Sequence, residues 1–144
     1  MDNTIQPLLA GKGQEVYSIL ASQSVFEAIS EMDARNVGAL IVKEDEKVVG
    51  IITERDYTRK VILKGRSSKE TPVETIMTRD LLVVSPEHTV RQAMELMTNR
   101  RCRHLPVFRE EELVGMLSIG DLVKAIIADQ EMKIQILEDY VSGG

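Results

Sequence analysis

The strongest constraint in this 144-residue chain is a motif that occurs twice, 65 residues apart. The first copy is Gly-Ile-Ile-Thr-Glu-Arg-Asp at residues 50–56, and the second is Gly-Met-Leu-Ser-Ile-Gly-Asp at residues 115–121. Each copy leads from an apolar run, through a hydroxyl residue, into a segment with helical periodicity whose first turn carries an aspartate. A junction of this kind either caps a helix or holds a ligand.

The motif belongs to a longer internal repeat, because residues 24–57 align with residues 89–122 without a gap and ten of the 34 positions are identical. Both copies begin with the pattern of a reciprocal capping box, Ser24 with Glu27 and Thr89 with Gln92. A unit of about 60 residues buries too little apolar surface alone, so we expect both to fold as one pseudo-two-fold body. The predicted elements are extended segments at 14–20 and 81–84, helices from 24 and 89, hairpins over 39–53 and 104–118, and helices at 54–63 and from 119 onward.

The composition excludes several classes of partner. A net charge of -5 and a chain with two Phe, three Tyr and no Trp argue against binding to nucleic acid. No apolar run approaches the roughly 20 residues that span a bilayer, and no signal-like segment opens the chain. The single cysteine, Cys102, suits a reducing compartment. We therefore expect a cytoplasmic protein with no nucleic-acid or membrane partner.

The two ends of the chain differ in pattern. Residues 1–13 contain Pro7 and no apolar period, which predicts a flexible N-terminal arm. The last helix keeps an apolar stripe beyond residue 128, at Ile134, Leu137 and Val141, so we expect it to pack on a second chain in a homodimer. The predicted organisation is an arm (1–13), a first repeat (14–68), a second repeat (69–128) and a C-terminal helical extension (129–144).

The repeated β-α-β-β-α order, with Gly, two apolar residues, Thr or Ser, and Asp three positions later, resembles a CBS-domain pair, or Bateman module. The resemblance covers roughly residues 14–130, and the segment 53–68 is similar to that of small stand-alone CBS-pair proteins of bacteria and plant organelles. It implies an α/β (α+β) fold of tandem repeats and a regulatory rather than catalytic role, transmitted to a regulated partner.

The resemblance also implies a ligand: an adenine nucleotide, AMP, ADP, ATP or NAD(H), between the two repeats. Asp56 and Asp121 would accept hydrogen bonds from ribose hydroxyls, which suits a carboxylate. The other expected contacts are Thr53 and Ser118 facing the ligand, Arg55, Arg101, Arg103 and His104 near phosphate, and Ile41, Ile52, Val107 and Leu117 around the base. The cations at 101–104 have no counterpart in the first repeat, which predicts unequal sites.

Two other interpretations stay open. Thr53 and Ser118 are good N-cap residues, and an aspartate in a first helical turn contributes about 0.3–1 kcal/mol by itself, so the junctions can serve a structural or protein-interaction module without a nucleotide. Cys102 lies between arginines that can lower its pKa, which allows a small redox protein, although no nearby base stands out and we expect no enzyme. Two histidines, His88 and His104, are too few to predict a metal site.

Overall fold

The computed structural model describes residues 2–12 and 15–143, which fold into a mixed α+β structure of small sheets and helices. The chain divides into two compact units, each described by itself here. The first-repeat unit comprises residues 15–81. The second-repeat unit combines the N-terminal segment with the chain from Leu82 onward.

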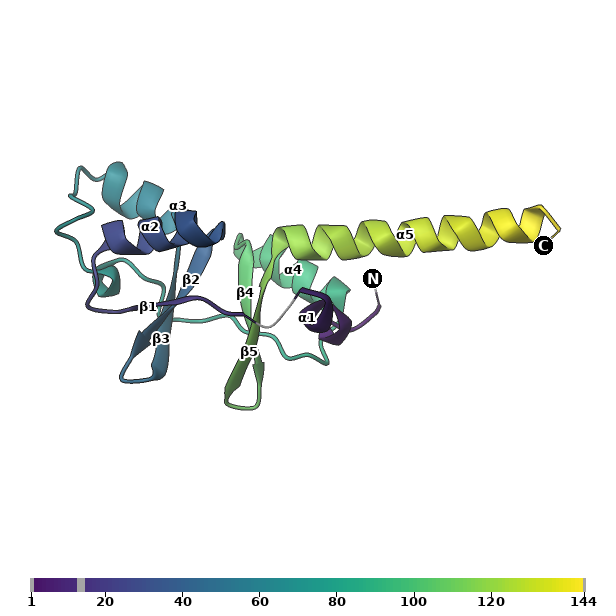
Figure 1. The fold of residues 1–144 in the computed structure, drawn as a ribbon, viewed down its shortest axis with the longest axis horizontal. Coiled ribbons are helices and arrows are strands. Elements are labelled where there is room, and N and C mark those ends of the chain that lie inside the picture. Colours follow the sequence, from purple (N-terminus) through teal and green to yellow (C-terminus); the bar gives the residue numbers. More distant parts are fainter. Residues whose placement is uncertain (1, 13–14, 144) are drawn as a thin grey trace. The chain divides into compact units, whose positions relative to one another are not determined.

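In the first-repeat unit, three strands form one sheet in the order β1-β2-β3 (Figure 1). The parallel pair is β1 (Ser18–Leu20) with β2 (Ala39–Glu44), and β2 pairs antiparallel with β3 (Lys47–Thr53). The helical elements are α2 (Val25–Arg35), α3 (Glu54–Tyr57), a π-helical segment (Thr58–Ile62) and a 3₁₀ turn (Val73–Thr75). The helix predicted over 54–63 is therefore present, but its second half is π-helical.

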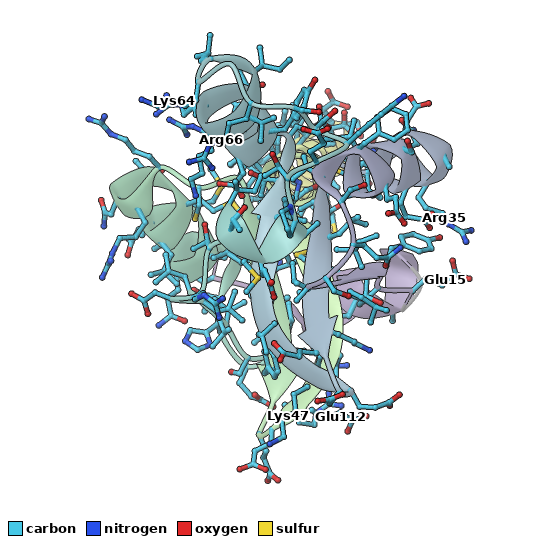
Figure 2. The ribbon with its side chains drawn as sticks, turned by 90° about the vertical axis from the view of Figure 1, so that its left-hand side faces the viewer. Glu15, Arg35, Lys47, Lys64, Arg66 and Glu112 are labelled. Atoms are coloured by element: carbon cyan, nitrogen blue, oxygen red, sulfur yellow. The ribbon has the colours of Figure 1, made fainter. Side chains whose placement is uncertain are left out.

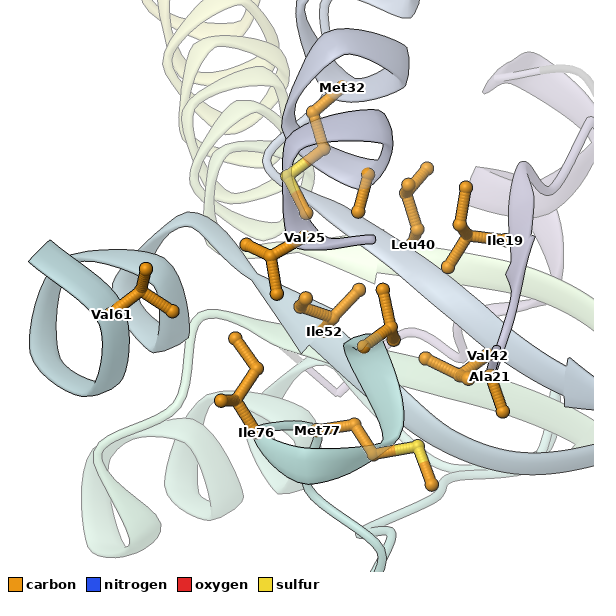
Figure 3. Close-up of a cluster of buried hydrophobic side chains, with 12 residues drawn as sticks. Ile19, Ala21, Val25, Met32, Leu40, Val42, Ile52, Val61, Ile76 and Met77 are labelled. Carbon is orange, nitrogen blue, oxygen red and sulfur yellow. The ribbon is translucent and has the colours of Figure 1, made fainter. Parts of the chain in front are cut away.

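The core of this unit forms between α2, the sheet and the segment that follows the repeat (Figure 3). The capping box predicted at Ser24 and Glu27 starts α2 and directs Val25 and Met32 inward. Because strand residues alternate between faces, Leu40 and Val42 reach the same core from β2. The segment after the repeat adds three buried side chains, Val73, Ile76 and Met77.

The second-repeat unit follows the same plan with a smaller sheet. Its elements are α1 (Gln6–Lys12), α4 (Val90–Arg100), β4 (His104–Arg109), β5 (Glu112–Ser118) and α5 (Ile119–Val141). The predicted capping box at Thr89 and Gln92 starts α4, and β4 pairs antiparallel with β5. The strand predicted over 81–84 is reduced to one parallel bridge from Val84 to Val107, where the first unit has β1.

The prediction of a flexible N-terminal arm is wrong for residues 2–12, and residues 1 and 13 lie outside the described residues. Ile5 is fully buried and Leu9 is 3% exposed, both in the core of the second-repeat unit. The Ile5 backbone N–H donates to the His88 carbonyl at 2.9 Å, and the Val90 N–H donates to the Asn3 carbonyl at 2.9 Å. The segment is ordered because it buries apolar side chains and satisfies backbone groups at the start of α4.

The N-terminal segment repeats, for the second unit, what residues 71–77 do for the first. Val25 N–H donates to the Thr71 carbonyl at 2.8 Å, as Val90 N–H does to Asn3. Val73 N–H likewise donates to the Gln23 carbonyl at 2.8 Å, matching the bond from Ile5 to His88. We call residues 3–9 and 71–77 the straps of the two units. The structure thus groups residues 69–81 with the first repeat, whereas the sequence pattern assigned them to the second.

Candidate functional site

The first junction of the repeated motif is a complete capping box. Thr53 ends β3 with an extended backbone, and its Oγ1 accepts a hydrogen bond from the Asp56 N–H at 3.1 Å. Asp56 Oδ2 in turn accepts from the Thr53 N–H at 3.0 Å. Both side chains therefore have a structural role at the start of α3, and the carboxylate is held in one orientation at the end of the strand.

The second junction has the same geometry. The Ser118 Oγ accepts from the Asp121 N–H at 3.2 Å, and Asp121 Oδ2 accepts from the Ser118 N–H at 2.8 Å. These bonds start α5 directly after β5. The sequence prediction that both motifs are strand-to-helix junctions with an N-cap hydroxyl and a carboxylate at the third helical position is confirmed.

A lysine that sequence reasoning missed engages the first aspartate. Lys60 Nζ lies 3.1 Å from Asp56 Oδ1 and donates to the Ile76 carbonyl at 2.8 Å. The Asp56 side chain is 12% exposed and that of Lys60 is 44% exposed. The i, i+4 spacing on a predicted helix was the available signal. The second repeat has Ala125 at the position of Lys60, so the two junctions differ in this contact.

The glycine that opens each motif is closely approached by residues of its strap or next to it, most severely at Gly50. A Cβ at Gly50 would lie 2.8 Å from both the Met77 sulfur and the Thr78 carbonyl oxygen. A Cβ at Gly115 would lie 2.7 Å from Leu9 Cδ2. The close approach of each strap to its strand therefore explains the repeated glycine without a ligand.

In the second-repeat unit, the backbone of two residues predicted to contact phosphate, Arg103 and His104, pairs with the strand-to-helix junction. His104 is the register partner of Ser118 in the β4–β5 pair, and the Ile119 N–H donates to the Arg103 carbonyl at 2.8 Å. Arg101 ends α4 with a φ of 53°. The first-repeat unit has Ala39 opposite Thr53 instead. The inequality of the two junctions stays a prediction, which rests on the cluster of cations that only the second carries there.

Two further arginines lie in the first-repeat unit. Arg55 is exposed in the first turn of α3, next to Asp56. Arg66 follows the π-helical segment, and Figure 2 shows its side chain pointing outward together with Lys64. Arg55 thus stays beside the junction, while Arg66 belongs to an exposed surface.

The four apolar residues expected around a base are all fully buried. Ile52 belongs to the core of the first-repeat unit, and Val107 and Leu117 belong to the core of the second. Ile41, on β2, is also fully buried. A side chain packed in a core contacts a ligand only after repacking, so a base contact by Ile52, Val107 or Leu117 would come from the strand backbone or need such repacking.

An open groove of about 460 Å³ lies between α2 and α3, beside the first junction. Its volume falls in the range of small-molecule sites. Thr53 and Asp56 are not among its lining residues, which are Ile29, Met32, Asp33, Asn36, Val37, Gly38, Glu54, Tyr57 and Thr58. The groove therefore lies next to the Thr53–Asp56 junction and does not contain the Asp56 carboxylate.

Cys102 does not have the character of a reactive thiol. Burial raises the pKa of the Cys102 thiol above its ordinary value, and the positive charge of Arg100 opposes this rise more weakly. A redox role would need the neighbouring arginines to lower this pKa, but desolvation outweighs the charge of Arg100. Among residues 2–12 and 15–143, no three His, Cys, Asp or Glu side chains gather as metal ligands would.

The repeated geometry agrees with a comparison against known families, in which the model described as "CBS domain" matches residues 13–62 and 73–128. The chain belongs to the CBS-domain family. CBS-domain proteins without another domain are generally regulatory modules, and CBS pairs commonly bind adenosine-containing ligands.

Three relatives illustrate the match. The CBS domain-containing protein CBSX3, mitochondrial, of Arabidopsis thaliana is 42% identical over 98% of this chain and 73% of its own length. A CBS-domain protein structure from Burkholderia ambifaria has a TM-score of 0.86 and 44% identity, covering 89% of this chain and 96% of that one. A hexameric CBS-CP12 protein from bloom-forming cyanobacteria has a TM-score of 0.75 and 30% identity, and the match covers 85% of this chain and 71% of that one.

The location of this CBS-pair protein stays a prediction, since one relative is named as mitochondrial. Within the described part of the chain, none of the helices has the length and apolarity needed to cross a membrane.

Proposed function

We propose that this CBS pair is a regulatory module that binds an adenine nucleotide, AMP, ADP, ATP or NAD(H), and transmits its occupancy to a partner protein. The observation that carries the proposal is the doubled junction. In each unit a carboxylate is fixed at the first turn of a helix, directly after a strand. Fixed carboxylate acceptors suit a pair of vicinal hydroxyls, as in a ribose, because a carboxylate accepts several hydrogen bonds at once.

Under this proposal, the second junction is the better binding site for phosphate. His104 pairs with Ser118 in the hairpin, the Arg103 carbonyl accepts from the Ile119 N–H, and Arg101 lies two residues earlier at the end of α4. The 23-residue helix α5 begins at this junction. Cationic side chains and a helix N-terminus both favour an anionic group. The first junction has Arg55 as its adjacent cation, so it suits a ligand, or a ligand portion, with less negative charge.

Lys60 offers a route by which occupancy is transmitted. Its ammonium joins Asp56 to the Ile76 carbonyl, which belongs to the strap of the first-repeat unit. A ribose whose hydroxyls donate to Asp56 competes with Lys60 for the same carboxylate. Lys60 is then released or reoriented, and the strap loses one of its anchors. A partner that contacts the strap can read this difference, within the limit set by the ligand's differential affinity for the two states.

A specific observation favours a second candidate, a protein-interaction module without a nucleotide. The boxes at Ser24 and Thr89, which are outside the junctions, have the same reciprocal bonds as those at Thr53 and Ser118. Capping alone therefore accounts for every hydrogen bond given above between the hydroxyl and the carboxylate of each junction. The Cys102 redox interpretation is not favoured, because burial raises the pKa of that thiol.

Thermal unfolding with a ligand panel separates the two candidates. AMP, ADP, ATP and NADH are each added in excess, with GMP and GTP as controls that keep the ribose and phosphates of AMP and ATP but change the base. A ligand at a hundred times its dissociation constant adds about 2.7 kcal/mol to the unfolding free energy, which raises the melting temperature by several degrees. A melting temperature unchanged by all four adenine ligands would leave the interaction module as the better account.

A further inference from the structure

The last part of α5 extends away from the described core of its own unit. Leu122 is fully buried and Ile126 packs against the core, but every described side chain from residue 130 to residue 143 is exposed. Figure 1 shows the helix continuing beyond α1 and α4 of the same unit. Several of the exposed side chains are large and apolar, including Ile134 at 54% and Leu137 at 64%. A solitary helical end of about a dozen residues is marginal in water, so this one needs a partner.

The exposed apolar side chains follow a heptad pattern. Starting from Val123, alternate steps of four and three residues reach Ile127, Gln130, Ile134, Leu137 and Val141. Positions a are then Ile127, Ile134 and Val141, and positions d are Val123, Gln130 and Leu137. The five apolar members are 42% to 82% exposed. A 4-3 spacing of this kind is the seam of a coiled coil, and β-branched residues at a with leucine at d favour two strands.

The charges beside the seam select a second copy in parallel orientation. Lys133 occupies a g position and Glu138 the e position five residues later. In a parallel pair these two face each other across the seam, once on each side, and Gln130 meets Gln130 of the second copy. In an antiparallel pair with the same overlap, Lys133 would face Lys133, and the Gln130 amide would lie against Ile134. The antiparallel pair keeps one attraction, between Lys124 and Glu138.

A membrane surface or a third helix fits the exposed face of α5 less well than a second copy does. The helix carries five carboxylates against two lysines, whereas helices that lie on membrane surfaces are rich in Lys and Arg. Lys133 also bridges Asp129 within the helix at 3.1 Å, and the three donors of its ammonium allow a second acceptor. Met132 and Ile136 are exposed but lie off the seam, where a third helix would have to pack.

We propose that α5 pairs with α5 of a second copy as a parallel two-stranded coiled coil over Val123–Val141. The helix would then hold the CBS units of both chains at the same end of the coil. This assembly does not depend on nucleotide binding, so it stands or falls separately from the function proposed above.

The test compares neighbouring substitutions on the two sides of the helix. Leu137→Glu places a charge in the seam, and Ile136→Glu places the same charge one residue away and off the seam, with matched effects on helix propensity. By sedimentation equilibrium across micromolar concentrations, we expect a dimer for the wild type and for I136E, and at least a tenfold weaker dimer for L137E. A wild-type monomer, trimer or tetramer, or equal dissociation constants for the two variants, would overturn the proposal.

Orientation is tested by crosslinking. In a Cys102→Ser background, Val141→Cys places two thiols face to face only in a parallel pair. We expect a disulfide-linked dimer on mild oxidation of C102S/V141C, and none of C102S alone. A stable dimer of C102S/V141C that forms no disulfide would overturn the parallel orientation.

Discussion

Lys60 Nζ lies 3.1 Å from Asp56 Oδ1 and, through the same ammonium, 2.8 Å from the Ile76 carbonyl oxygen. A nucleotide whose ribose donates to Asp56 therefore competes with a cation that also anchors the strap of its unit. This contact distinguishes the first junction from the second, where Ala125 stands in place of the lysine.

Removing Lys60 should strengthen binding at the first junction. Lys60→Met keeps the length of the side chain and abolishes its competition for Asp56, and a partly exposed ion pair is worth about 1 kcal/mol or less. We expect calorimetry to give an affinity for an adenine nucleotide up to about fivefold tighter than that of the wild type. Lys64→Met, at an exposed position of the same unit, should change nothing. Weaker binding by K60M would show that Lys60 holds the ligand rather than competing with it.

The two motif glycines should differ in their tolerance of alanine. A Cβ at Gly50 meets a backbone carbonyl, which cannot move without shifting the strap, whereas at Gly115 it meets the end of the Leu9 side chain. We expect Gly50→Ala to lower the unfolding free energy by about 1–3 kcal/mol and Gly115→Ala by less. Urea unfolding of the two variants measures the difference, and an equal or reversed order would contradict the described strap contacts.

The N-terminal segment should behave as core. Ile5→Ala removes a fully buried side chain, which typically costs about 2–5 kcal/mol. Leu63→Ala, at a side chain that is 71% exposed, is the control and should stay near the wild type. Thermal or urea unfolding checks both variants. If I5A were as stable as the control, residues 2–12 would be the flexible arm that the sequence pattern predicted.

The fold was largely predictable because its elements depend on local chemistry. All four capping boxes, the two hairpins and the long last helix follow from side chains within a few positions of each other. The N-terminal strap was missed because Asn3–Leu9 shares no identical residue with Thr71–Met77 when the two are aligned, although Ile5 matches Val73 in character. Its order comes from packing on a distant part of the chain, which a short apolar segment does not reveal.

The backbone positions of the candidate residues were predictable from the sequence, but not all of their contacts were. The register of β4 and β5, which brings His104 beside Ser118, follows from the hairpin. The full burial of Ile52 and Leu117 depends on how helices cover each sheet, and the bond from Lys60 to Ile76 joins segments that meet only in the folded unit.

The first capping box should make stability depend on pH. The hydrogen bond from Gln23 and those from Ser24 hold the pKa of Glu27 below its ordinary value of 4.5. Because the folded pKa is lowered, this contribution is present above about pH 4.5 and is lost as the pH falls through the folded pKa. Glu27→Gln copies Gln92 of the second box, which does not titrate. We expect the stability of E27Q to fall less steeply than that of the wild type from about pH 5 to pH 3, and equal slopes in urea unfolding would disprove this.

The central claim, that the junction aspartates hold a ribose, is tested most directly by calorimetry with AMP, ATP and NADH on Asp56→Ala and Asp121→Ala. Hydrogen bonds to a charged group are worth about 1.5–3 kcal/mol, so each substitution should weaken its own site by about tenfold or more. Glu27→Ala and Gln92→Ala remove the same capping position from boxes outside the junctions and should keep the wild-type affinity. Weakened binding in the aspartate variants alone is the predicted result, and equal affinities in all four variants, or no binding by the wild type, would contradict it.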